Sequence, residues 1–187
     1  MAKNVIKYII FIWFTLCSNI LNSQWVLGYH PEVTGDDIIK EAKTHIGVVE
    51  DTNNNDGYFI ENYILKPLRL PKGTAYCAAF ISFVYNNCGV KNHPNTAWSP
   101  SWAKDQDAVY KKNKFGGIED GEPGDVVSFW RQNKGRVGHV GIFEIYQGNY
   151  VYTIEGNTSD MGDKGKDGIW GKVRHKSTIY TITTYIR

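Results

Sequence analysis

The sequence predicts an α+β fold, in which N-terminal helices pack on one face of a C-terminal antiparallel sheet of about five to six strands. Up to about Tyr110 the apolar residues recur at helical spacing. After Phe115 the chain consists of β-branched and aromatic runs separated by turn residues. Helices followed by strands, in a chain of 187 residues, indicate one α+β domain.

The sequence predicts three helices before the strands, and the start of a fourth. Apolar residues on one face predict a first helix beginning near Asp36, and a short second helix contains Tyr58 and Ile64. A longer helix is predicted over about Tyr76–Asn87, ending at Gly89, because glycine adopts the left-handed conformation that closes a helix.

The fourth helix is predicted at Ser99-Pro100. Serine caps free backbone N–H groups and proline suits the first helical turn. We expect this helix to run towards Tyr110.

The second half of the chain alternates strands with turns such as Pro123-Gly124 and Gln147-Gly148-Asn149. Short connections make successive strands antiparallel neighbours. The predicted strands are Asp125–Trp130, Val137–Tyr146, Tyr150–Glu155, Gly168–Val173 and Thr178–Ile186.

Residues 1–23 have the pattern of a secretory signal peptide. Lys3 and Lys7 precede the apolar run Tyr8–Leu16, and polar residues follow it. The run is too short for a stable membrane span. We expect cleavage after Ser23, which would release residues 24–187 as a single exported domain.

Cys17 offers an alternative as a lipid-modified cysteine. Leu16 before it is a poor match to the small residue expected there, so a lipoprotein is less favoured. The expected location is therefore the periplasm or the exterior of the cell.

The charge excludes a nucleic-acid partner. The chain has 21 basic and 19 acidic residues, and removal of Lys3 and Lys7 with the signal peptide leaves 19 of each. A neutral body offers no basic surface to a phosphate backbone.

Two cysteines remain after residue 23, Cys77 and Cys88. Their spacing along one helix corresponds to roughly 16 Å, beyond the Cα separation of about 7 Å that a disulfide allows. Both are therefore predicted to be free thiols. Cys77 is the candidate nucleophile, because the start of a helix favours the thiolate; Cys88 is expected to be structural.

His139 is the candidate base. It lies in Gly138-His139-Val140-Gly141 at the start of a predicted strand, and the glycines remove side chains beside the imidazole. We expect this space to admit the backbone of a substrate.

The next strand ends in candidate orienting groups. Strand alternation puts Thr153 and Glu155 on one face, and a turn lets Asn157 point back. A cysteine nucleophile needs a base, and the base needs an orienting acceptor. Cys77, His139 and either Glu155 or Asn157 supply all three.

Four segments form a set: Tyr76–Phe83, Gly121–Val127, Gly138–Ile142 and Ile154–Thr158. They resemble the signature blocks of the CHAP-domain (cysteine, histidine-dependent amidohydrolase/peptidase) family. This family belongs to the papain-like superfamily that also contains the NlpC-type cell-wall peptidases. The resemblance extends over roughly Asp36–Asp167.

The resemblance implies a papain-like fold and a thioester mechanism. Cys77 would be the nucleophile, His139 the general base and acid, and Glu155 the orienting residue, assisted or replaced by Asn157. The implied substrate is the peptide part of peptidoglycan, cut at the N-acetylmuramoyl-L-alanine amide or within the stem or cross-bridge. No cofactor is expected, and a monomer is expected.

Aromatic residues are candidates for a substrate groove beside Gly138. Tyr76 stands where the family more often has tryptophan, and it would supply an aromatic wall. Trp98 and Trp102 are further candidates for the groove.

One loop is rich in oxygen ligands at close spacing: Asp51, Asn53, Asn55 and Asp56. The EF-hand pattern fails, because Asp56 replaces its glycine and Asn62 replaces its terminal glutamate. A solvated loop is favoured over a calcium site. No His or Cys pair has zinc-ligand spacing.

Two alternatives to a wall hydrolase stay open. One is an inactive peptidoglycan-binding domain of the same fold, which the complete set of Cys77, His139, Glu155 and Asn157 disfavours. The other is a papain-like antibacterial effector that acts on another amide.

Overall fold

The computed structural model describes residues 32–159 and 165–186. The predicted signal peptide, its cleavage after Ser23 and the alternative lipid site at Cys17 lie outside these residues. From Val33 onward the chain forms one unit. None of the helices formed by the described residues is long and apolar enough to cross a membrane.

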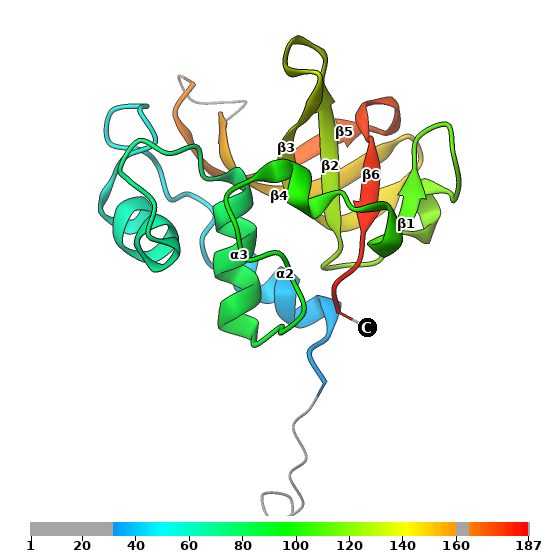
Figure 1. Ribbon diagram of the computed structural model, residues 1–187, viewed down its shortest axis with the longest axis horizontal. Coiled ribbons are helices and arrows are strands. Elements are labelled where there is room, and N and C mark those ends of the chain that lie inside the picture. The colour runs from blue at the N-terminus through cyan, green and yellow to red at the C-terminus, as the bar shows by residue number, and fades with distance from the viewer. Residues whose placement is uncertain (1–31, 160–164, 187) are drawn as a thin grey trace, which may run out of the picture. The chain divides into compact units, whose positions relative to one another are not determined.

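Within the described residues, six strands form one antiparallel sheet in the order β1-β6-β2-β3-β4-β5 (Figure 1). The strands are β1 (Ala108–Lys111), β2 (Val126–Arg131), β3 (Arg136–Gln147), β4 (Tyr150–Ser159), β5 (Asp167–His175) and β6 (Thr181–Thr183). Strands β2 to β5 form the predicted meander, and β6 lies between β1 and β2.

Two α-helices in the described part of the chain, α2 (Gly35–Lys43) and α3 (Cys77–Cys88), lie together on one side of the sheet (Figure 1). Helix α3 packs against β3 and β4, and α2 packs against α3. Thr34 and Asp37 form a capping box that fixes the start of α2. The predicted α+β fold is confirmed.

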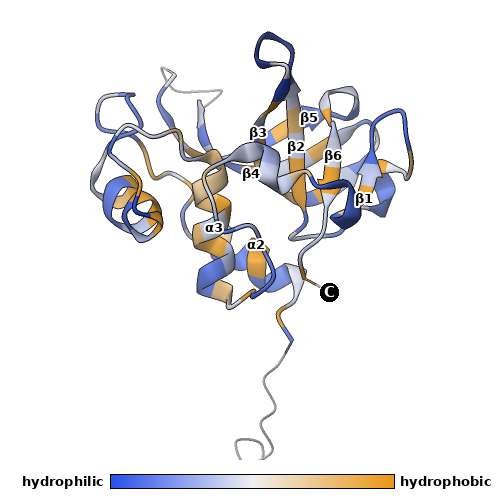
Figure 2. Ribbon diagram, viewed as in Figure 1, coloured by the Kyte–Doolittle hydropathy of each residue, from blue (hydrophilic) through white to orange (hydrophobic). Residues whose placement is uncertain are grey.

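Helix α3 is apolar on nearly all sides, because it is buried between the sheet, α2 and the following loop. It approaches β4 closely at Gly156, where an added Cβ would lie 2.8 Å from the Cβ of Phe80. The helix ends as predicted at Gly89, whose φ of 82° is left-handed. In Figure 2 most of the α3 ribbon is orange, the colour of hydrophobic residues.

The helix predicted from Ser99 towards Tyr110 is wrong. Ser99–Trp102 and Asp105–Asp107 are single 3₁₀ turns, and the chain then becomes β1, which pairs with β6. The physical reason is tertiary. Trp102 is fully buried, and its carbonyl accepts a hydrogen bond from the hydroxyl of Thr183 in β6, so the segment is held to the sheet.

Other predicted elements differ in detail, and β4 runs to Ser159 instead of ending at Glu155. The short second helix is a π-helical turn over Ile60–Leu65. The last strand is shorter than predicted, since only Thr181–Thr183 pairs within the sheet.

Trp102 and Trp98 provide a matched test of this packing. The ring of Trp102 is fully buried and packs edge-to-face on Tyr85 and Tyr185, whereas Trp98 is 53% exposed. Trp102→Ala should lower the free energy of unfolding by about 3–5 kcal/mol. Trp98→Ala should lower it by no more than about 1 kcal/mol. Denaturant titration measures both, and equal losses would contradict this assignment.

Candidate active site

Cys77 is the first residue of α3, and its side chain is 5% exposed. The first N–H groups of a helix have no partner within it and carry a partial positive charge. The sulfur also lies 3.5 Å from the hydroxyl oxygen of Ser99. Both features favour a thiolate at this position.

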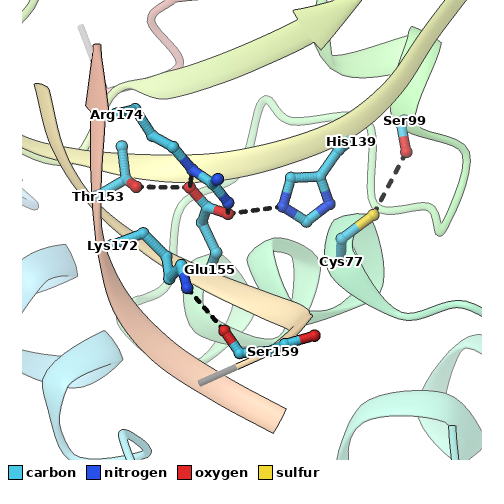
Figure 3. Close-up of polar contacts among 8 residues, drawn as sticks. All are labelled: Cys77, Ser99, His139, Thr153, Glu155, Ser159, Lys172 and Arg174. Carbon is cyan, nitrogen blue, oxygen red and sulfur yellow. Dashed lines mark hydrogen bonds and ion pairs between the residues drawn. The ribbon is translucent and has the colours of Figure 1, made fainter. Parts of the chain in front are cut away.

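His139 lies on β3 with its imidazole between two partners (Figure 3). On one side, Nε2 lies 2.7 Å from Oε2 of Glu155 on the neighbouring strand β4. On the other side, the ring faces the sulfur of Cys77. The structure therefore brings the three predicted residues into one continuous line.

The carboxylate of Glu155 is fully buried. Arg174 of β5 donates two hydrogen bonds to it, of which the one from Nε to Oε1 is 2.8 Å long. The hydroxyl of Thr153, on the same face of β4 as predicted, donates to Oε1 at 2.6 Å. Gly141 leaves room for the side chain, since an added Cβ would lie 2.6 Å from Cγ of Glu155.

At Cys77, His139 and Glu155, burial and the neighbouring groups shift the pKa in opposite directions. Burial raises the pKa of Glu155, but Arg174 and His139 lower that pKa to about 2. Burial lowers the pKa of His139, but the neighbouring sulfur of Cys77 and the hydrogen-bonded carboxylate of Glu155 raise it to about 9.

Burial likewise raises the pKa of Cys77, and His139 lowers that pKa to about 7. A thiolate beside an imidazolium is therefore the favoured state between about pH 7 and pH 9. Such a pair combines a nucleophile with a proton donor, which is the equipment for acyl transfer.

Asn157 does not take the orienting position. Its side-chain amide donates to Glu50 Oε1 at 3.3 Å and to Asn55 Oδ1. Its backbone is left-handed, with a φ of 55°, and this conformation directs the amide to the loop before the π-helical turn. Of the two predicted orienting residues, only Glu155 contacts His139 in the structure.

A cleft of about 540 Å³ leads to Cys77 and His139. Gly138 and Trp98, both predicted for the groove, line it, and so does Asn157.

The other two groove predictions are wrong, since Tyr76 and Trp102 are fully buried. Trp102 belongs to the core. The ring of Tyr76 is buried near Glu50, and both the burial and the charge of Glu50 raise the pKa of the Tyr76 hydroxyl.

Gly138 has a different physical role from the one predicted. An added Cβ would lie 2.4 Å from Cγ of Arg131 and 3.4 Å from Cδ of Lys134. The glycine thus makes room for charged side chains of this chain, which then line the cleft.

Sequence reasoning missed Ser99, Arg131 and Arg174. Arg174 had no local signal, because its partner lies on another strand 19 residues away. The sequence predicts Ser99 only as a helix cap, although its neighbour in space is Cys77.

The oxygen-rich loop is bonded to its own chain. The Asp56 carboxylate accepts from the backbone N–H and the hydroxyl of Thr52 at 2.9 and 2.6 Å. The Asn55 amide donates to the carbonyl of Gly73. Among residues 32–159 and 165–186, no group of three or more His, Cys, Asp or Glu could hold a metal ion.

Comparison with known proteins gave one family match. Residues 70–157 match the family model of the CHAP domain, a segment that includes Cys77, His139, Glu155 and Asn157. This confirms the resemblance, over a shorter segment than Asp36–Asp167. A search of curated proteins gave no significant match.

The solved structures that match include that of an NlpC/P60 family protein from Bacillus cereus ATCC 10987. The sequence identity is 15% and the TM-score is 0.46. The similarity covers 84% of this chain and 42% of that protein, so this chain spans less than half of its length.

The thiol of Cys77 should titrate near neutral pH. Its alkylation by iodoacetamide should rise with a midpoint near pH 7, because the thiolate forms above its pKa of about 7. Burial raises the pKa of Cys88 to about 11, so Cys88 should react slowly at pH 8. Peptide mass spectrometry resolves the two sites.

His139→Ala supplies the control. Without the imidazolium, the strongest influence that lowers the pKa of Cys77 is lost while burial still raises it, so the midpoint should move to higher pH. A midpoint that stays in place would remove His139 as the source of the low pKa.

Proposed function

Because residues 70–157 match the CHAP domain, we propose that this protein is a cysteine hydrolase that cuts an amide bond in the peptide part of peptidoglycan. One observation carries the proposal: Cys77, His139 and Glu155 lie in line, at a helix start and on two adjacent strands. This arrangement has a nucleophile, a proton carrier and an orienting anion, which acyl transfer requires.

In the proposed mechanism, the thiolate of Cys77 attacks the carbonyl carbon of the scissile amide. The oxyanion that forms is stabilised by the backbone N–H of Cys77 at the start of α3. The imidazolium of His139 gives its proton to the leaving amine as the C–N bond breaks. A thioester and a free amine result.

Hydrolysis of the thioester completes the cycle. His139, now neutral, takes a proton from water as the water attacks the thioester carbonyl. The C–S bond breaks, the acid leaves, and the thiolate–imidazolium pair is restored. Glu155 stays anionic throughout, because its pKa is about 2.

We further propose that the protein acts outside the cytoplasm, where its substrate lies. The support is the composition of residues 1–23, which is typical of a secretory signal peptide.

Digestion of purified peptidoglycan tests the activity. The wild type should release new stem-peptide fragments or free muramic carboxyl ends, and Cys77→Ala should release none, since the nucleophile is lost. Mass spectrometry of the products names the bond. Product from both proteins alike, or from neither while Cys77 reacts rapidly with iodoacetamide, would count against a wall hydrolase.

The pH dependence of kcat/KM tests the ion pair. It should rise through about pH 7 as Cys77 loses its proton, and fall above about pH 9 as His139 loses its own. Glu155→Gln removes the anion that holds the proton on His139, so the alkaline limb should move to lower pH.

Glu119→Gln is the matched control, because Glu119 is exposed and outside the cleft. Its pH profile should equal that of the wild type. An alkaline limb that is the same in Glu155→Gln would show that Glu155 does not set the pKa of His139.

A further inference from the structure

The catalytic cleft carries cations without matching anions. Arg131, Lys134 and Arg136 line it, and among the described residues no aspartate or glutamate does. All three belong to the hairpin between β2 and β3, whose tip is deep blue in Figure 2. The body of the protein is neutral, with 19 basic and 19 acidic residues beyond position 23, so the charge of the cleft is a local arrangement.

This arrangement does not serve the stability of the hairpin. Arg131 and Arg136 are direct cross-strand partners, and like charges opposite each other destabilise a sheet. Within the described part of the chain, none of the ion pairs involves Arg131, Lys134 or Arg136. These cations are therefore open to solvent and to an anionic ligand.

Two contacts position the arginines at the cleft. Gly138, the residue before His139 in the sequence, has no side chain, so the Arg131 side chain can lie across β3 at this point. The Arg136 guanidinium lies 4.1 Å from the centre of the Trp98 ring and donates to the Val137 carbonyl at 2.8 Å. A guanidinium held in this way loses little freedom when it binds a carboxylate through two hydrogen bonds.

A second cavity, of about 550 Å³, extends the cationic surface. It shares Arg131 and His139 with the catalytic cleft and adds Lys112 and Arg174. Among the described residues it too has no acidic side chain in its lining. Arg131 therefore lies where the two cavities meet, beside the catalytic base.

We propose that the cleft selects substrates with a free carboxylate close to the scissile amide, and that Arg131 and Arg136 bind this carboxylate. The inference rests on the proposed function and narrows its substrate class. Stem peptides of peptidoglycan present carboxyl groups either free or amidated, and the enzyme would prefer the free form.

Two synthetic stem peptides that differ only in carboxylate or carboxamide provide the direct test. A charge-assisted hydrogen bond contributes about 1.5–3 kcal/mol, so wild-type kcat/KM should be at least about tenfold higher for the carboxylate. Arg131→Gln and Arg136→Gln should each lower kcat/KM much more on the carboxylate peptide than on the carboxamide peptide, and so remove most of this preference. Equal wild-type rates on both peptides would overturn the proposal.

Lys91→Gln is the matched control, because Lys91 is exposed and does not line either cavity. It should keep the full preference. A loss on both peptides alike in the arginine variants would indicate a structural role and would also overturn the proposal.

A second measurement is independent of peptidoglycan. In a Cys88→Ser background, Cys77 is alkylated with iodoacetate, an anion, and with neutral iodoacetamide. The ratio of the two rates should fall severalfold in Arg131→Gln and Arg136→Gln and stay unchanged in Lys91→Gln.

The two measurements separate the two proposals. If neither stem peptide is cut, the proposed function fails, and a falling alkylation ratio still supports an anion-binding cleft. If the ratio is the same in all variants, the cationic cleft does not recognise anions, whatever the peptides show.

Discussion

The buried charge of Glu155 is the constraint on which the rest of the site depends. A carboxylate without exposure to water is costly unless it is paired and hydrogen-bonded. Arg174, Thr153 and His139 together occupy both of its oxygens. Because these partners come from β3, β4 and β5, satisfying one anion aligns three strands and fixes the ring that faces Cys77.

Close packing by glycine supports this alignment. Gly141 admits the side chain of Glu155, and Gly156 admits Phe80 of the helix that carries Cys77. Gly138 admits Arg131 at the mouth of the cleft. In each case a side chain at the glycine would overlap a neighbour. These glycines therefore set the distances between Cys77, His139 and the cationic side chains that line the cleft.

The cleft combines a reactive centre with a costly surface. Glu155 stabilises the imidazolium of His139. Among the described residues, the cleft residues Arg131, Lys134 and Arg136 have no such acidic partner. Opposed arginines at a hairpin end lower stability, and functional sites commonly contain such local conflicts. In the proposed reaction, the same charge attracts an anionic substrate towards the thiolate at the start of α3.

The sequence by itself determined the features that depend on residues close together in the chain. Helical periodicity and Gly89 predicted α3, period-two alternation placed Thr153 and Glu155 on one face, and the helix start marked Cys77. Tertiary structure decided what depends on distant partners. Trp102 became core, Ser99–Tyr110 did not continue as a helix, and Asn157 bonded to Glu50. Arg174 found Glu155 only because β5 pairs with β4. Local propensity indicates an element and its faces, but only the paired sheet determines which side chains share the buried space between them.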